Sequence, residues 1–557
     1  MLVLLGEAVW RRAGCAICAC LSAAAAVHAE TLTYVLTPAP QQGHLHVELS
    51  WQTAGRTESR LCAVPRCGTV SDVPALFKDL RIDGATSVRR DKACWQIEHR
   101  SGAALRCRYT VDPGRREFDW EHTHHPITTK QFFHGLGNAF LVTPVAGGGQ
   151  PDEYEVLVRW KLPDGWRAVC SWGSGPSVGA RMKPDDVRQS VYLAGRIVTE
   201  RTPVAGGGEV TVAMLDEFGF DVAALGQLSA EVIAEQCAFM RETAFPPFVV
   251  TAIPVGPAVV GGDLRIAGMG LYQSFALCIS PRAELTDGVE HLFAHELFHT
   301  WNGRLVQGEN PEELVYWFTE GFTDYYALRI LFESGRWTAG VYAGWLNRHL
   351  REYAANPARN ATNEEIQAGY WKQRATVGEV AYQRGLLLGL RWHRLARQKG
   401  VTEGIDRLFH ALVARARDGQ PTISNALLRR EGCRVLGDWF GPEFDRYVTR
   451  AETIEVPSDA LAPELRGRVR TVYEFELGFE RERSLRAERV HGLKKDSAAA
   501  KAGLREGDDL IGWRIPTDAD DQVQLQVKRG DTLKTITYRP RGARRDLLQF
   551  AAGGKDD

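Results

Sequence analysis

Two histidines four residues apart carry the clearest chemical signal in the sequence. His295 and His299 enclose Glu296 in the segment His-Glu-Leu-Phe-His, and Glu320 follows twenty-one residues after the second histidine. On a helix, residues i and i+4 lie on one face, so both imidazoles can reach one metal ion. A carboxylate from a following helix would complete three protein ligands and leave the fourth tetrahedral position to water. The spacing therefore predicts one zinc ion (Zn2+) per chain, bound by His295, His299 and Glu320.

Glu296 supplies the second part of this chemistry. It adjoins the first histidine, so it would stand beside the zinc-activated water as a general base. Such a base removes a proton while water attacks a carbonyl and returns it to the leaving amine. The sequence therefore predicts a zinc-dependent hydrolase of peptide bonds, with Glu296 as its catalytic base.

Asp324 and His291 fall on the same predicted helix faces as the ligands. Asp324 lies four residues after Glu320 and could accept the free ring N–H of a zinc histidine, which would fix its tautomer. An exposed helix aspartate is the equal alternative. His291 lies one turn before His295, and a fourth protein ligand would close the site to water. We therefore interpret His291 as a packing residue or a neighbour of the ligands.

Composition excludes several other function classes. The chain has 557 residues, of which 44% are hydrophobic and 25% charged, which is enough for about three or four globular domains. A formal net charge of −1 gives no long-range field to attract nucleic acid or an anionic membrane. The sequence shows no nucleic-acid motif and no apolar run beyond the N-terminus that could span a bilayer. A peptide substrate is the expected partner.

The first 29 residues have the pattern of a secretory signal peptide. Arg11 and Arg12 precede an apolar run that ends in small residues, with a cleavage site after Ala29. An N-terminal anchor helix is the alternative. The leader predicts a periplasmic or secreted location, where disulfides can form. Close pairs among the eight cysteines beyond the leader, such as Cys62 with Cys67 and Cys94 with Cys107, are then candidates. Sequence does not fix their connectivity, and buried free thiols are the alternative.

The chain beyond the leader divides into three parts. Residues 30–215 alternate short strands with turns, which is typical of a β-sandwich. Helical spacing begins near Phe218, and a helix-rich block with a short strand region before the zinc helices fills residues 216–455. Strand-like composition returns in residues 456–550. The predicted fold class is therefore multidomain α+β, with β-rich domains on both sides of a helical catalytic domain.

Two motifs resemble those of a known family. Residues 295–302 read His-Glu-Leu-Phe-His-Thr-Trp-Asn, and residues 317–326 read Trp-Phe-Thr-Glu-Gly-Phe-Thr-Asp-Tyr-Tyr. They closely resemble the glycyl aminopeptidase family of gluzincin metallopeptidases. The resemblance implies an N-terminal β-domain, a thermolysin-like catalytic domain and a C-terminal PDZ domain. It also implies an aminopeptidase that prefers small N-terminal residues.

A tyrosine role follows from the same resemblance. Residues 380–385, Val-Ala-Tyr-Gln-Arg-Gly, are similar to the Tyr-x-Lys-Gly segment that supplies a hydroxyl to the oxyanion in related gluzincin aminopeptidases. This implies that Tyr382 donates a hydrogen bond where negative charge develops on the scissile carbonyl. A core tyrosine at a helix start is the alternative. Arg384 replaces the lysine of the pattern, which keeps the charge but changes the donor geometry.

The strand before the first zinc helix departs from the family pattern. Family members carry a Gly-Gly-Leu-Glu-His-like segment, and the resemblance implies that its acidic residue binds the substrate amine. Here residues 268–274 read Gly-Met-Gly-Leu-Tyr-Gln-Ser, and alignment on Ser274 places Gly270 at the glutamate. An ammonium buried without a carboxylate loses about 2–5 kcal/mol. Either another acid substitutes or aminopeptidase specificity is weakened, so an endopeptidase on the same scaffold is an alternative.

The C-terminal part has a resemblance of its own. Residues 492–511 look like the strand, short helix and Gly-Asp turn of PDZ domains, and Leu477-Gly478-Phe479 resembles the carboxylate-binding loop. No room remains between Ile511 and the hairpin at 523–538 for the longer PDZ helix. The region is therefore expected either to bind a peptide terminus or to pack on the catalytic domain. A non-enzymatic PDZ-type binding protein is a further alternative.

Overall fold

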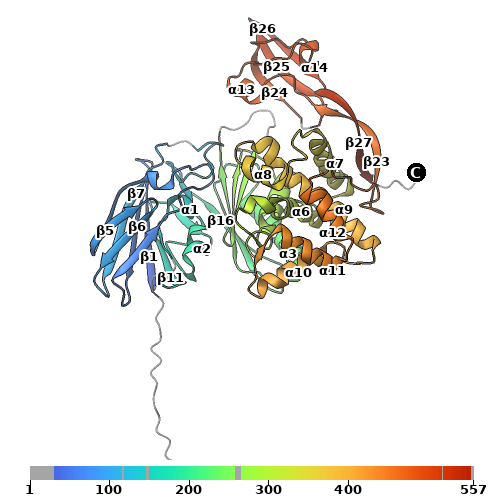
Figure 1. Cartoon of the computed structure of the whole chain (residues 1–557). Coiled ribbons are helices and arrows are strands. Elements are labelled where there is room, and N and C mark those ends of the chain that lie inside the picture. Colours follow the sequence, from blue (N-terminus) through green and yellow to red (C-terminus); the bar gives the residue numbers. More distant parts are fainter. Residues whose placement is uncertain (1–29, 116–117, 146–149, 257–264, 517, 553–557) are drawn as a thin grey trace, which may run out of the picture.

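The computed structural model describes residues 30–552 except 116–117, 146–149, 257–264 and 517. The predicted leader lies outside the described residues. Strands of the N-terminal part, a helical centre and a second strand region follow one another along the chain (Figure 1). Within the described ranges, no helix is both long and apolar enough to cross a bilayer.

Three sheets form the N-terminal part, with strand orders β14-β11-β1-β2-β7-β4, β10-β3-β6-β5 and β13-β12-β15-β9-β8. Along β1, every second side chain is buried, because successive side chains of a strand point to opposite faces. All three sheets contribute to one core, for example through Tyr34, Trp95 and Phe133. The predicted N-terminal β-rich domain is confirmed. The bounds are β1 Thr31–Ala39, β2 His44–Gln52, β3 Glu58–Cys62, β4 Phe77–Asp83, β5 Ala85–Asp91, β6 Cys94–His99, β7 Ala104–Val111, β8 Ile127–Thr128, β9 Phe132–Leu136, β10 Thr143–Pro144, β11 Tyr154–Trp160, β12 Arg167–Cys170, β13 Gly173–Ser174, β14 Ser177–Met182 and β15 Val191–Gly195, with short helices α1 Gly137–Phe140 and α2 Pro184–Arg188.

The disulfide in this part differs from the pairs considered from the sequence. Cys62 is bonded to Cys94, whereas Cys67 and Cys107 carry free thiols. Cys62 and Cys94 face each other on the neighbouring strands β3 and β6, with their Cα atoms 4.1 Å apart. Pairing of these strands brings the two cysteines together. This disulfide could not be predicted from nearness along the chain.

A mixed five-stranded sheet begins the catalytic part, in the order β16-β17-β18-β20-β19. Its strands are β16 Val198–Pro203, β17 Glu209–Met214, β18 Phe248–Pro254, β19 Ile266–Leu271 and β20 Ser274–Ile279. β17 pairs in parallel with β18 across helix α3 (Val222–Met240), and β16 pairs with β17. The sheet therefore starts with β16 at Val198. The predicted division at residue 215 therefore does not follow the sheets. β16 and β17 resemble the preceding strands in composition, so only long-range pairing separates them.

Helices cover this sheet and hold the predicted zinc motifs. Helix α4 packs on the sheet through Phe293, whose ring centroid lies 5.2 Å from that of Phe275. It packs on α6 through Phe298, 5.0 Å from the ring of Tyr326. The predicted helical domain is confirmed. Its helices are α4 Asp287–Phe298, α5 Tyr316–Thr319, α6 Gly321–Glu333, α7 Ala339–Ala355, α8 Asn363–Gly369, α9 Glu379–Gln398, α10 Asp406–Arg417, α11 Asn425–Leu436 and α12 Phe440–Phe444.

The C-terminal part consists of a two-stranded ribbon and a three-stranded sheet. The ribbon pairs β23 (Leu465–Phe475) with β27 (Arg541–Ala552), and the sheet contains β24 (Asp509–Arg514), β25 (Val523–Arg529) and β26 (Thr532–Tyr538). The helices in its described residues are short, α13 Arg481–Arg486 and α14 Ala498–Lys501. The sheet has its own core, whereas the ribbon end reaches the catalytic core through Phe550. The identification of a PDZ domain stays a prediction.

A close crossing of α6 and α9 sets the distance between two predicted site residues. A Cβ built on Gly385 would lie 1.9 Å from the carbonyl oxygen of Trp317, and one on Gly321 would lie 2.5 Å from the Cα of Gly385. Both obstacles are backbone atoms, so no flexible side chain can move aside. Glu320 and Tyr382 adjoin this crossing and depend on it for their separation.

The substitution Gly385→Ala should therefore separate the two helices. We expect a loss of about 1–3 kcal/mol in the free energy of unfolding, because added volume in a packed contact forces backbone shifts. Gly344→Ala on α7 is the matched control, since nothing lies within 4 Å of its Cβ position, and it should stabilise by about 0.5–1 kcal/mol. Chemical denaturation of both variants measures this, and equal stabilities would contradict the packing argument.

Candidate metal centre

The three predicted zinc ligands converge on one point. The Nε2 atoms of His295 and His299 lie 3.1 Å apart, and Oε2 of Glu320 lies 3.4 and 3.5 Å from them. Two nitrogens at zinc-ligand distance from one tetrahedral ion lie about 3.3 Å apart. The donor set of two imidazoles and one carboxylate therefore fits a zinc ion.

Two neighbouring elements bring these atoms together. His295 lies in the last turn of α4 and His299 is the residue that caps its end. Glu320 occupies the junction between α5 and α6, directly before Gly321. Since α4 packs on α6 through aromatic rings, the two histidines face the junction that carries the carboxylate.

Each histidine ring is oriented by the nitrogen that faces away from this point. Nδ1 of His295 donates to Oδ1 of Asp324 at 2.7 Å, and Nδ1 of His299 donates to the carbonyl of Asn302 at 2.8 Å. An ionised carboxylate and a carbonyl only accept, so each ring carries a proton on Nδ1, and its Nε2 is the nitrogen left to bind a metal. Asp324 is buried, so the alternative of an exposed aspartate does not apply.

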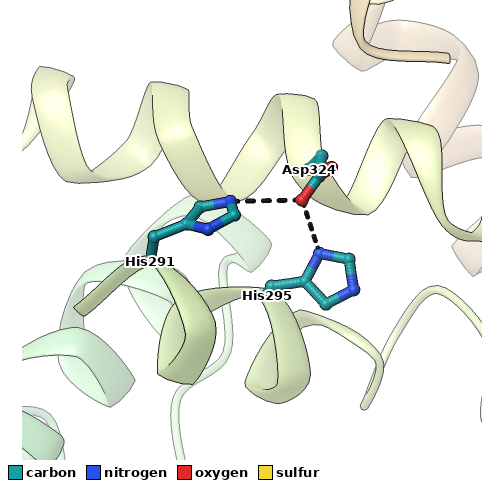
Figure 2. Close-up of side chains that lie close together, drawn as sticks. All are labelled: His291, His295 and Asp324. Atoms are coloured by element: carbon teal, nitrogen blue, oxygen red, sulfur yellow. Dashed lines mark hydrogen bonds and ion pairs between the residues drawn. The ribbon is translucent and has the colours of Figure 1, made fainter. Parts of the chain in front are cut away.

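His291 contacts the carboxylate that orients His295 and not the three converging donor atoms. Its Nε2 lies 3.1 Å from Oδ1 of Asp324, and Figure 2 shows this carboxylate between the two rings. The ring of His291 also packs against Trp345, with the centroids 4.5 Å apart. His291, His295 and Asp324 could form a second metal-binding group by distance alone. The hydrogen bond from His295 already accounts for this arrangement, which agrees with the interpretation of His291 as a neighbour of the ligands.

Charges at the centre favour an anionic carboxylate ligand. Burial alone would raise the pKa of Glu320, but the adjacent His299 and His295 outweigh it and lower that pKa far below its usual value. Burial likewise opposes the charged form of His295, yet the carboxylate of Asp324 raises the pKa of His295 well above its usual value. The carboxylates that favour the charged histidines would likewise attract a divalent cation, which would displace the Nε2 protons on binding.

Glu296 is held by the edge strand of the sheet. Its Oε2 accepts a hydrogen bond from the backbone N–H of Gly270 on β19 at 2.7 Å. A Cβ at position 270 would lie 2.8 Å from the carbonyl oxygen of Glu296 and 2.9 Å from its Oε2. In this arrangement, position 270 has no room for any side chain. Gly270, which stands where the family pattern has a glutamate, thus allows the predicted base to lie against the strand.

Tyr382 lies beside the centre on α9. Its ring is stacked 6.0 Å from that of His295, and its hydroxyl lies 3.0 Å from the hydroxyl of Tyr370. Burial raises the pKa of Tyr382 well above its usual value, so the hydroxyl keeps its proton and can donate it in a hydrogen bond. The side chain is half-buried, which fits a site residue better than a core tyrosine.

Arg384 does not take part in the site. Its side chain is buried, with Nη1 donating to Oδ1 of Asn363 at 3.0 Å and Nη2 donating to the carbonyl of Ala361. These contacts join α9 to the start of α8. The position that resembles the lysine of the family pattern therefore has a structural role here.

Asn302 is a site residue to which the sequence reasoning assigned no role. Besides accepting from His299, it donates through Nδ2 to the carbonyl of Phe318 at 2.9 Å, and to Thr319 and Thr323 at 3.2 and 3.1 Å. It thus joins the end of α4 to the segment that carries Glu320. Its place in the His-Thr-Trp-Asn motif was a signal, but the motif alone does not reveal these partners.

Comparison with known proteins supports this assignment. Residues 289–387 match the model of the M61 glycyl aminopeptidase family, and the match spans all five predicted catalytic and zinc-binding residues. No curated protein sequence matches the chain.

Two solved structures share the fold. An aminopeptidase N family protein from Idiomarina loihiensis is 16% identical with a TM-score of 0.68, and the alignment covers 94% of this chain and 98% of that one. An M1 zinc metallopeptidase from Deinococcus radiodurans is 14% identical with a TM-score of 0.51, covering 77% of this chain and 96% of that one. The resemblance inferred from the motifs is confirmed over residues 289–387, where the chain carries a segment that matches the M61 glycyl aminopeptidase family.

Proposed function

We propose that this protein hydrolyses peptide bonds with one zinc ion per chain, bound by His295, His299 and Glu320. The convergence of their three donor atoms, with both Nδ1 protons directed to acceptors, carries the proposal. A zinc ion bound there would polarise the scissile carbonyl and lower the pKa of a coordinated water to near neutrality.

The residues of the chain supply the proton transfers and hydrogen bonds. Glu296 has one oxygen held by the Gly270 N–H, so its other oxygen can accept a proton from water and pass it to the leaving amine. The hydroxyl of Tyr382 donates to the carbonyl oxygen as negative charge develops there. If Tyr370 donates to the oxygen of Tyr382, the proton of Tyr382 is left for the substrate.

The family description supports an aminopeptidase that prefers small N-terminal residues. One observation favours a second candidate, an endopeptidase on the same scaffold. Because Glu296 fills the space beside Gly270, no acidic side chain at that position can bind a substrate ammonium. The non-enzymatic alternative is set aside, because the chain carries the metallopeptidase segment.

Location and the role of the C-terminal part belong to the same proposal. The predicted leader and the disulfide between Cys62 and Cys94 support a periplasmic or secreted protein. Contacts of the C-terminal ribbon with α7 support packing on the catalytic part, since the Asn347 side chain exchanges two hydrogen bonds with the backbone of Phe550. Binding of a peptide terminus by this part stays a prediction.

A digest of a peptide pool tests the proposed function. The pool contains each peptide with a free and with an acetylated N-terminus, and mass spectrometry follows cleavage with and without a chelator. We expect cleavage that stops on chelation and returns with zinc. Cleavage of free peptides alone supports an aminopeptidase, and cleavage of acetylated ones supports an endopeptidase. A folded, zinc-loaded protein that cleaves no peptide would refute hydrolysis.

Glu296→Gln should abolish the base without removing a metal ligand. We expect the turnover rate to fall by about 10²–10⁴ while zinc content stays at one per chain. Glu364→Gln, at an exposed position on α8, is the control and should keep full activity. Steady-state kinetics and metal analysis measure both, and comparable turnover of the two variants would overturn the assignment of the base.

Tyr382→Phe should remove one hydrogen bond to the developing oxyanion. We expect kcat to fall by about 10²–10³ with little change in zinc content, because the hydroxyl acts on the substrate and not on the metal. A kcat near that of the unsubstituted protein would show that Tyr382 only packs against His295.

Asp324→Asn should weaken metal binding through His295. Loss of the anionic acceptor removes the group that orients the ring and raises its basicity, so zinc affinity should fall by about 10–100-fold. Competition with a chromogenic chelator measures the affinity. Asp438→Asn, an exposed aspartate, should bind zinc as tightly as the unsubstituted protein. Unchanged affinity in Asp324→Asn would contradict the role given to the hydrogen bond.

A further inference from the structure

Arg304 brings a guanidinium next to the proposed catalytic base. Its Nη2 donates to the carbonyl of Gly270 at 3.1 Å, and its Nη1 donates to Oε1 of Gln189 at 3.0 Å. The N–H of the same glycine holds Glu296. A single residue of the edge strand therefore places the base through its N–H and the guanidinium through its carbonyl.

This guanidinium has no carboxylate partner in the described part of the chain. Both of its acceptors are uncharged, and within the described ranges no ion pair reaches it at 4.0 Å or less. The side chain is half-buried, and burial lowers the pKa of Arg304. A partly desolvated charge without a direct ion-pair partner is unfavourable, and an anionic ligand would offset that cost.

The geometry leaves donors for such a ligand. A guanidinium has five N–H donors in a rigid fork, and the two protein contacts each occupy one. The remaining N–H groups can bind a carboxylate, which matches the planar fork of arginine better than any other common peptide group. The contact between Arg304 and Gly270 fixes the orientation of the fork beside Glu296 before a ligand arrives.

Two nearby acids influence Arg304 without neutralising it. Asp186 on α2 and Glu296 both raise its pKa by their charge, but neither lies within ion-pair distance. Glu296 accepts a hydrogen bond from the N–H of Gly270 and is the proposed catalytic base. Asp186 is half-buried and close enough to act on Arg304 by its charge, so it is the competing candidate for binding a substrate ammonium.

We propose that Arg304 forms an anion subsite that binds a carboxylate of the peptide substrate close to the scissile bond. This inference rests on the proposed peptidase function and names the substrate class of that site. An ammonium placed next to the same guanidinium would be repelled, so a free amino terminus of the substrate would have to lie away from Arg304. An acidic side chain and the C-terminal carboxylate of a short peptide share this chemistry.

The test compares kcat/KM for matched peptides. One N-acetylated, C-amidated series carries Glu or Gln at each position around the cleaved bond, and a second carries a free or amidated C-terminus. We expect the unsubstituted protein to prefer the carboxylate form by at least about 30-fold. The series that shows the preference identifies the side chain or the C-terminus as the source.

Variants of Arg304 decide whether this residue causes the preference. In Arg304→Gln the ratio of acidic to neutral kcat/KM should fall close to one, and in Arg304→Lys part of the ratio should remain, because the charge stays and the fork is lost. Arg407→Gln, an exposed arginine on α10, should keep the full ratio. A preference that survives in Arg304→Gln overturns the proposal.

Three further results separate the subsite from the peptidase function. Equal kcat/KM for acidic and neutral peptides in the unsubstituted protein overturns the subsite and leaves hydrolysis intact. A preference for free amino termini that disappears in Asp186→Asn also overturns it, because the amine would then be the recognised group. If no peptide is cleaved, calorimetric binding of N-acetylglutamate amide against N-acetylglutamine amide tests the subsite directly, and equal affinities refute it.

Discussion

The hydrogen bond from His295 to Asp324 constrains the rest of the centre. A buried imidazole has two nitrogens, and the partner of one decides what the other can do. With the proton on Nδ1 directed to Asp324 at 2.7 Å, the ring presents Nε2 toward Glu320. This requires α4 and α6 to keep a fixed position relative to each other, because the donor lies on one helix and the acceptor on the other. His299 obeys the same rule within its own loop through the carbonyl of Asn302.

Packing around the centre maintains the relative position of these helices. Gly321 and Gly385 allow α6 and α9 to touch backbone to backbone, which places Tyr382 next to the ligands. On the side of the sheet, Gly270 lets Glu296 approach the backbone of the edge strand closely. Small residues therefore stand where catalytic groups from different elements must approach one another, and the large aromatic side chains fill the core behind them.

Local patterns made the ligand set predictable. The spacing of His295 and His299 follows from helix periodicity alone, and Glu320 follows from a motif within one short segment. The structure places all three together, as it places Asp324 against a zinc-site ring. The helical domain and the N-terminal β-rich domain were likewise predictable, because hydrophobic periodicity is a local property.

Features that depend on distant pairing were not predictable. The disulfide of Cys62 joins strands that become neighbours only in the folded sheet, and the true start of the central sheet at Val198 depends on pairing beyond α3. The contact that leaves no space beside Gly270 comes from a helix twenty-six residues later. No role for Arg304 could be predicted from the sequence, because an arginine shortly after a metal motif is common. Its uncharged hydrogen-bond partners are visible only in the structure.

The ribbon end that reaches the catalytic core has a consequence for how this chain can acquire its native state. Phe550 lies in the same hydrophobic cluster as the rings around the zinc motifs, and its backbone is bound by Asn347 on α7. A chain without β27 would lose Phe550 from this cluster and both contacts of the Asn347 side chain with that strand. We therefore expect the catalytic part to reach its full stability only when the ribbon is formed and packed on α7.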